Sequence, residues 1–110
     1  MNGIFGQYLR LKQPYPDHLL LVRIGDFYEA FGVDARTLAD TCDLTLASRK
    51  LGKHSRISMA GVPHFTLNKY VDQLVAAGHD IALAEEIGRD KINGLLPRQV
   101  TKLVTEVNHA

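Results

Sequence analysis

The sequence has little cysteine, little net charge and no long apolar run. Its one cysteine, Cys42, cannot form a disulfide within the chain, which excludes a disulfide-stapled scaffold and fits a reducing cytoplasm. The longest apolar run, Leu19 to Val22, is far too short to cross a bilayer. The N-terminus MNGIFGQYLRLK lacks the apolar core of a signal peptide. We therefore expect a cytoplasmic protein that does not enter a membrane.

The net charge is only +1 over 110 residues. Proteins that grip DNA through many phosphates usually carry more positive charge, so a nucleic-acid role here would need locally gathered charge and would be weak. The composition, 45% hydrophobic and 23% charged, is that of a soluble globular protein. The length fits one domain, and such a domain can bury roughly two-thirds of its unfolded surface.

The sequence also lacks the usual motifs of catalysis and metal binding. None of the five histidines pairs with a cysteine or another histidine at metal-ligand spacing, and no GxSxG occurs. Gly52-Lys53-His54 resembles the end of a P-loop, but Ala47 replaces its first glycine and a histidine replaces its Ser/Thr. Glu85 and Glu86 are adjacent and would point to opposite faces of a strand. We expect a binding domain rather than an enzyme, with no metal and no cofactor.

Apolar periodicity predicts alternating helices and strands. The expected helices span residues 2–12, with Asn2 as cap, 34–42, with Asp34 as cap, and 64–77. The expected strands span residues 19–24, 27–31, 44–47, 57–62, 81–87 and 99–107, with loops over 48–56 and 89–97. Gly25-Asp26 offers a tight hairpin turn between the first two strands. This order predicts one α/β domain with a mixed sheet of about six strands flanked by helices.

The segment Phe27-Tyr28-Glu29 follows that turn and carries unusual chemistry. In a strand, residues two apart lie on the same side about 7 Å from each other, so Phe27 and Glu29 would face one target while Tyr28 faces away. An aromatic ring can enter a base step, and a carboxylate can meet a base-edge donor or take up a proton near phosphates. The plainer interpretation makes Phe27 a core residue and Glu29 a solvated one, and Phe31 on the same face favours it. Spacing alone leaves both open.

Short segments along nearly the whole chain match, in order, the pattern of one protein family. They are Gln7-Tyr8-Leu9, Pro16-Asp17, Arg23 to Glu29, Asp34-Ala35, Leu44-Thr45-Leu46, Met59 to Pro63, Tyr70, Leu74-Val75, Gly78, Ala82 with Glu85, Val100 and Leu103-Val104-Thr105. In this order they resemble the N-terminal, mismatch-recognition domain of the DNA mismatch-repair family MutS. The segments GDFYE and MAGVP are its most specific parts.

The resemblance implies site residues and a partner. It implies that Phe27 wedges beside a mispaired or unpaired base from the minor groove and that Glu29 hydrogen-bonds that base. Ile24 and Met59 match positions that line the same contact, and Lys102 falls where the family often has an arginine near DNA. The implied partner is double-stranded DNA with a mismatch or small bulge, in the bacterial cytoplasm or nucleoid.

The segment from Ser48 to Arg56 holds four basic residues. We expect three of them to contact phosphates: Arg49, Lys50 and Lys53. The alternative, a merely solvated loop, stays open.

The sequence departs from the family in three ways. Ala84-Glu85-Glu86 stands where the family commonly has Cys-Glu-Gln. Val104-Thr105 is followed by Glu106 rather than Pro-Gly-Thr, which leads us to expect a natural stand-alone domain or fragment. The chain, residues 1–110, includes no lever, clamp or ATPase domain of the family, so weak DNA binding is expected, with possible association with other repair proteins.

Two other functions stay open beside DNA binding. A regulatory or protein-interaction module that kept the fold is one alternative. A nuclease-type domain is another, disfavoured because no Asp…Glu-x-Lys metal cluster is evident.

Overall fold

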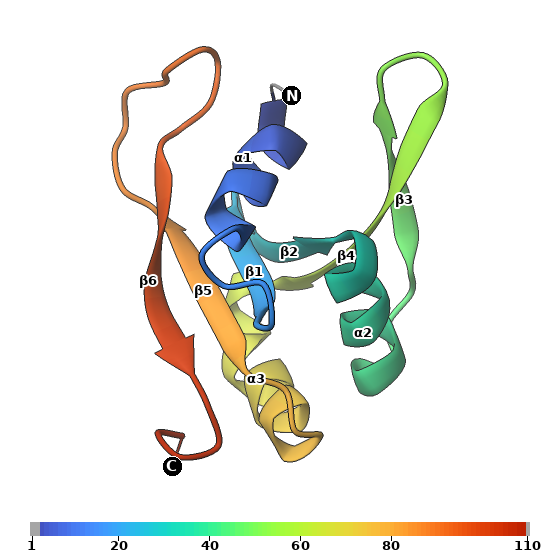
Figure 1. Cartoon of the computed structure of the whole chain (residues 1–110), viewed down its shortest axis with the longest axis vertical. Coiled ribbons are helices and arrows are strands. Elements are labelled where there is room, and N and C mark those ends of the chain that lie inside the picture. Colours follow the sequence, from blue (N-terminus) through green and yellow to red (C-terminus); the bar gives the residue numbers. More distant parts are fainter. Residues whose placement is uncertain (1–2, 110) are drawn as a thin grey trace.

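A six-stranded mixed sheet organises the computed structural model, which describes residues 3–109 (Figure 1). Its elements are α1 Gly3–Lys12, β1 Leu19–Ile24, β2 Phe27–Phe31, α2 Gly32–Cys42, β3 Ala47–Leu51, β4 Ser55–Pro63, the 3-10 turn η1 His64–Thr66, α3 Leu67–Ala76, β5 Ile81–Glu86 and β6 Arg98–Val104. The strand order is β3-β4-β2-β1-β5-β6. Strands β1 and β5 are parallel and the other neighbours are antiparallel. The predicted α/β fold with a mixed sheet is confirmed.

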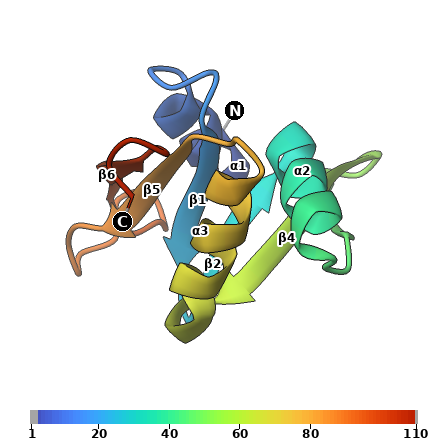
Figure 2. The same ribbon diagram turned by 90° about the horizontal axis from the view of Figure 1, so that it is seen from below.

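The core lies on both sides of this sheet. On one side, Leu21 and Tyr28 pack with residues of α2 and α3, among them Leu38 and Leu74. On the other side, α1 covers a smaller cluster that contains Tyr8, Leu20, Val22, Phe31, Ala82 and Ala84. Figure 2 shows β1 with α1 and α3 to either side of it. The strands β1 and β5 are therefore buried on both faces, as their unbroken apolar sequences predict.

The first hairpin is as predicted. Ile24 pairs with Phe27, so Gly25 and Asp26 alone connect β1 to β2. Gly25 has a φ of +58°, a left-handed conformation that glycine adopts without steric cost. This short turn fixes the register and so decides which side each residue of β2 faces.

The basic segment was predicted wrongly. Residues 44–46 form no regular element, and the expected loop over 48–56 is instead most of a hairpin in which β3 pairs with β4 from Leu51–Ser55 onward. Its reversal is helped by Gly52, whose φ is +68°. The hairpin is exposed on both faces, so its sequence shows no alternation of apolar and polar residues.

The predicted cap of the second helix is wrong. Asp34 does not cap α2, which begins at Gly32 with Phe31 as N-cap residue. Its Oδ2 instead accepts hydrogen bonds from the Tyr8 hydroxyl at 2.7 Å and the Leu20 amide at 3.0 Å, and pairs with Lys12 at 2.9 Å. The carboxylate thus ties α1, β1 and α2 together. The predicted cap Asn2 lies outside the described residues.

The remaining differences concern ends of elements. The helix expected over 64–77 is divided into η1 and α3, and the strands expected to end at 87 and 107 end at Glu86 and Val104. Within residues 3–109, no helix is both long enough and apolar enough to cross a membrane.

Candidate nucleic-acid interface

Strand β2 presents Phe27 and Glu29 on one side and buries Tyr28 on the other. The Phe27 side chain is 45% exposed, whereas Tyr28 is 7% exposed and belongs to the cluster under α2 and α3. Phe31, on the Phe27 side, is the residue that fills the core there, packing edge-on against Tyr8 with ring centroids 5.0 Å apart. The aromatic at position 27 is therefore a surface residue at the end of a buried strand.

The neighbouring strands supply the surroundings of this pair. Phe27 lies between Ile24 on β1 and Pro63 on β4, and Glu29 lies between Val22 and Gly61. Residues directly opposite each other in an antiparallel ladder share a face. Ile24 is partly buried beside Phe27, so the structure brings these two predicted residues together. Phe27 is thus flanked by the apolar side chains of Ile24 and Pro63.

Met59 is the second residue that was expected to line the contact. It pairs with Phe31 rather than with Phe27 or Glu29, and it packs partly buried against the α1-side cluster. It shares the side of the sheet with Phe27 but lies two pairs beyond Glu29 along β2.

The carboxylate of Glu29 has no hydrogen-bond partner in the described part of the chain. It is half-buried, and burial raises its pKa, while the positive charge of Arg49 opposes that rise. The other half-buried carboxylates are all engaged: Asp34 as described, Glu85 by the Tyr28 hydroxyl at 2.7 Å and Glu86 by Arg98 at 3.2 Å. A partly desolvated carboxylate without a donor is costly to keep, and such groups mark candidate binding sites.

The hairpin formed by β3 and β4, here called the basic hairpin, carries positive side chains on both faces of the sheet. Arg49 pairs with Ile57, which packs against the α1-side cluster, so Arg49 lies on the side of Phe27 and Glu29. Lys50 pairs with Arg56 and is on the opposite side. Lys53 lies in the turn. Figure 1 shows the hairpin of β3 and β4 extending from the body of the sheet. Of the three predicted phosphate contacts, only Arg49 shares the face of the site by register.

Lys102 is not brought together with this group. It lies on β6, opposite Leu83, whose side chain is in the cluster under α2 and α3. Strands β1 and β5 separate β6 from β2. Lys102 is thus on the other face of the sheet and at its far edge.

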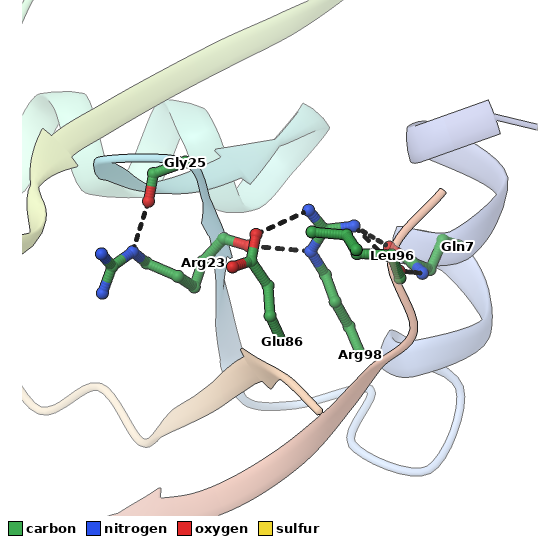
Figure 3. A network of polar contacts seen from close by, with 6 residues as sticks. All are labelled: Gln7, Arg23, Gly25, Glu86, Leu96 and Arg98. Carbon is green, nitrogen blue, oxygen red and sulfur yellow. Dashed lines mark hydrogen bonds and ion pairs between the residues drawn. The ribbon is translucent and has the colours of Figure 1, made fainter. Parts of the chain in front are cut away.

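The residue that sequence reasoning missed most clearly is Arg98, whose side chain is only 5% exposed. Its Nε donates to the Arg23 carbonyl at 2.8 Å, Nη1 donates to Gln7 Oε1 at 2.9 Å and to the Leu96 carbonyl at 3.2 Å, and Nη2 pairs with Glu86 (Figure 3). This network joins α1, β1, β5 and β6 beside the hairpin that carries Phe27. No sequence motif signals it, because its members are far apart in the chain.

A second missed feature is Phe65 in η1, which is 80% exposed. The His64 amide donates to the Asp26 carbonyl at 2.8 Å, which fixes η1 to the β1–β2 turn. The sequence pattern placed Phe65 in a helix and gave no sign that it would be left uncovered.

These features define a class: a small α/β domain that presents, on one face of its sheet, an exposed aromatic side chain and a carboxylate without a partner among residues 3–109. Within residues 3–109, no three His, Cys, Asp or Glu side chains gather as a metal site would require. The model of the family MutS domain I matches residues 2–109. The chain therefore belongs to the MutS domain I family, the mismatch-recognition domain that the sequence resembled.

The relatives of the chain are much longer proteins. The chain is 44% identical over 107 residues to the DNA mismatch repair protein MutS of Methanothrix thermoacetophila, covering 96% of the chain and 12% of that protein. It is 46% identical over 100 residues to the DNA mismatch repair protein MutS of Lactococcus lactis subsp. cremoris strain MG1363, covering 90% of the chain and 12% of that protein. The chain thus spans about an eighth of the length of the relatives it matches.

Proposed function

We propose that this chain binds double-stranded DNA at a mismatched or unpaired base, with Phe27 as the wedge and Glu29 as the group that hydrogen-bonds the base. The observation that carries the proposal is the pairing of a 45% exposed aromatic with a half-buried carboxylate that has no partner in the described structure, two residues apart on β2. Family membership supports the same function, because the relatives are named DNA mismatch repair proteins.

The recognition step is mechanical as well as chemical. Inserting Phe27 between bases requires unstacking and bending, and a mismatched step resists both less than a paired one. Stacking of an aromatic on a base is worth roughly 1–3 kcal/mol. The wedge therefore favours sites that deform easily, whatever bases they contain.

Glu29 supplies the polar part of the contact. Burial raises its pKa, and approaching phosphates raise it further, so the carboxyl group can accept from a base-edge donor or, once protonated, donate. One side chain then serves several mispairs. Arg49, on the same face, is positioned to meet the backbone and draw the duplex toward β2.

Binding by this chain is expected to be weak. The net charge is +1, and only Arg49 among the hairpin cations shares the face of the wedge. Few phosphate contacts mean a small salt slope and a high dissociation constant. Association with other repair proteins would add the missing affinity in the cell, in the bacterial cytoplasm or nucleoid.

The decisive experiment measures binding at low salt to a G·T duplex, a one-base bulge and the matched duplex. We expect the wild type to prefer the first two and Phe27→Ala to lose that preference. Leu103→Ala is the control, because Leu103 is a 38% exposed apolar residue on β6, away from the site. A wild type without preference, or a Phe27→Ala variant that keeps it, would contradict the proposal.

A protein-interaction module is the second candidate, and Phe65 favours it. Phe65 is 80% exposed, and the hydrogen bond of His64 to the Asp26 carbonyl fixes its segment to the turn that leads to Phe27. If Phe65→Ala and Phe27→Ala both leave DNA binding unchanged, this candidate replaces the first.

A further inference from the structure

We propose that Gly61 is a positioning residue for Glu29: the missing side chain at position 61 leaves the recess on β4 in which the Glu29 side chain lies. The inference rests on the proposed function, because it concerns how Glu29 is held ready for a base. It adds a residue on a different strand to the recognition site.

The geometry of the two strands carries this inference. Gly61 pairs directly with Glu29 across β2 and β4. A Cβ atom at Gly61 would lie 3.0 Å from Glu29 Cγ, 3.1 Å from the Tyr28 carbonyl oxygen and 3.6 Å from Glu29 Oε1. Carbon atoms in comfortable contact are about 3.5–4.0 Å apart. Any side chain at position 61 would therefore occupy the space that Glu29 now uses.

The φ of Gly61 gives no reason for glycine at this position. Gly61 is absent from the glycines with positive φ, unlike Gly25 and Gly52 at their turns. Glycine inside a strand weakens that strand, and it often marks a close approach by another group. Here the approaching groups are the Glu29 side chain and the Tyr28 carbonyl oxygen.

The recess explains how Glu29 can be half-buried without a hydrogen-bond partner in the described part of the chain. Glu29 is paired with Val22 on β1 and Gly61 on β4, and its Cγ and Oε1 atoms lie close to the place of a Cβ at Gly61. The Glu29 side chain therefore lies over β4 rather than extending freely into water. A methyl group at position 61 would push the side chain outward, away from the position where a base would meet it beside Phe27.

A double-mutant cycle tests the inference on DNA. Wild type, Gly61→Ala, Glu29→Ala and the double variant are compared for the ratio of affinities for G·T and matched duplexes at low salt. We expect each single variant to lose about three- to tenfold of the preference, the contribution of one hydrogen bond. The double variant should lose no more, because both changes remove the same interaction with the base. Additive losses, or an unchanged ratio in Gly61→Ala, would overturn the inference.

A matched control separates positioning from general crowding. A Cβ at Gly88 would lie 3.1 Å from Pro97 Cγ, so Gly88→Ala adds the same methyl group in a similarly tight place, without a Glu29 contact. We expect Gly88→Ala to lower the unfolding temperature without changing the mismatch preference. If Gly88→Ala changes the preference as Gly61→Ala does, the effect is not specific to Glu29.

A measurement without DNA keeps the inference distinct from the proposed function. NMR titration of the Glu29 carboxyl group in the free chain should show its pKa falling toward the ordinary glutamate value in Gly61→Ala, because the displaced carboxylate enters water. An unchanged pKa would overturn the inference, whether or not the chain prefers mismatches. Conversely, a shifted pKa in a chain without mismatch preference would leave Gly61 as the positioning residue and reject the proposed function.

Folding of the variants is itself informative. If Gly61→Ala unfolds, the Glu29→Ala/Gly61→Ala chain, which lacks the 3.0 Å contact, should fold. If the double variant also unfolds, the Tyr28 carbonyl is the group that excludes a side chain, and the inference fails.

Discussion

The Tyr28 hydroxyl donates a hydrogen bond to Glu85 Oε2, 2.7 Å away, although β1 lies between their strands. On β1, Arg23 pairs with Tyr28, and its guanidinium carbon lies 5.7 Å from the centre of the Tyr28 ring. Burial, and then the bond to Glu85, raise the pKa of Tyr28, so the hydroxyl stays protonated as a donor. This contact holds Tyr28 on one side of the sheet while Phe27 and Glu29 occupy the other.

Replacing Tyr28 with phenylalanine should therefore cost stability but not recognition. Tyr28→Phe removes one hydrogen bond and is expected to lower the free energy of unfolding by about 0.5–1.5 kcal/mol. Urea denaturation measures this, with Tyr70→Phe as control because no hydrogen bond of the Tyr70 hydroxyl occurs within the described residues. Loss of mismatch preference in Tyr28→Phe would show that the two faces of β2 are coupled.

The two faces of the basic hairpin predict unequal effects on DNA binding. Arg49→Glu should flatten the salt dependence, with the slope of log affinity against log salt falling by about one for each phosphate that the arginine neutralised. Lys50→Glu, the matched charge reversal on the opposite face, should change the slope less. Equal slopes in wild type and Arg49→Glu would mean that the hairpin is merely solvated.

The raised pKa of Glu29 makes stability depend on pH in a definite direction. The folded state holds the proton more tightly than the unfolded state, whose pKa is near the ordinary 4.5. Stability from this group is thus present at low pH and is lost as the pH rises from the unfolded to the folded pKa. Glu29→Gln should lack this loss. Thermal unfolding of both proteins across that window measures the difference, and parallel curves would contradict it.

Removing the buried Arg98 guanidinium is expected to lower the free energy of unfolding strongly. Arg98→Met leaves Glu86 and the Arg23 carbonyl without their donor and is expected to cost about 3 kcal/mol or more. Adding Glu86→Gln should recover part of that loss, because the unpaired charge is then gone. Chemical denaturation of the single and double variants checks both. A single variant within about 1 kcal/mol of wild type, close to the range of surface changes, would show that the network is not structural.

Local patterns predicted five of the six strands and missed β3, whose residues are almost all exposed. The apolar run of β1 and the glycine of its turn give an unambiguous register, so the placement of Phe27 and Glu29 follows from the sequence. Strand β3 has four exposed residues in five, and its pairing with β4 replaces burial as the reason it is a strand.

Contacts between distant segments were beyond sequence reasoning for a different reason. The partners of Asp34 and of Arg98 come from positions up to 91 residues away, and no spacing rule joins them. The family resemblance indicated Phe27 and Glu29. That Glu29 lacks a partner among the described residues, that Gly61 lies beside it and that Lys102 is far from it all depend on how the strands pair.

Strand β3 has a further consequence as the open edge of the sheet. Its outer side has no neighbouring strand within the described chain, and such an edge can pair with another copy of the protein. Arg49 and Lys50 place one positive charge on each face of that edge, and two such edges brought together would repel. Arg49, which is proposed to approach phosphates, thus also opposes pairing of two such edges, so neutralising Arg49 is expected to lower DNA affinity and solubility together.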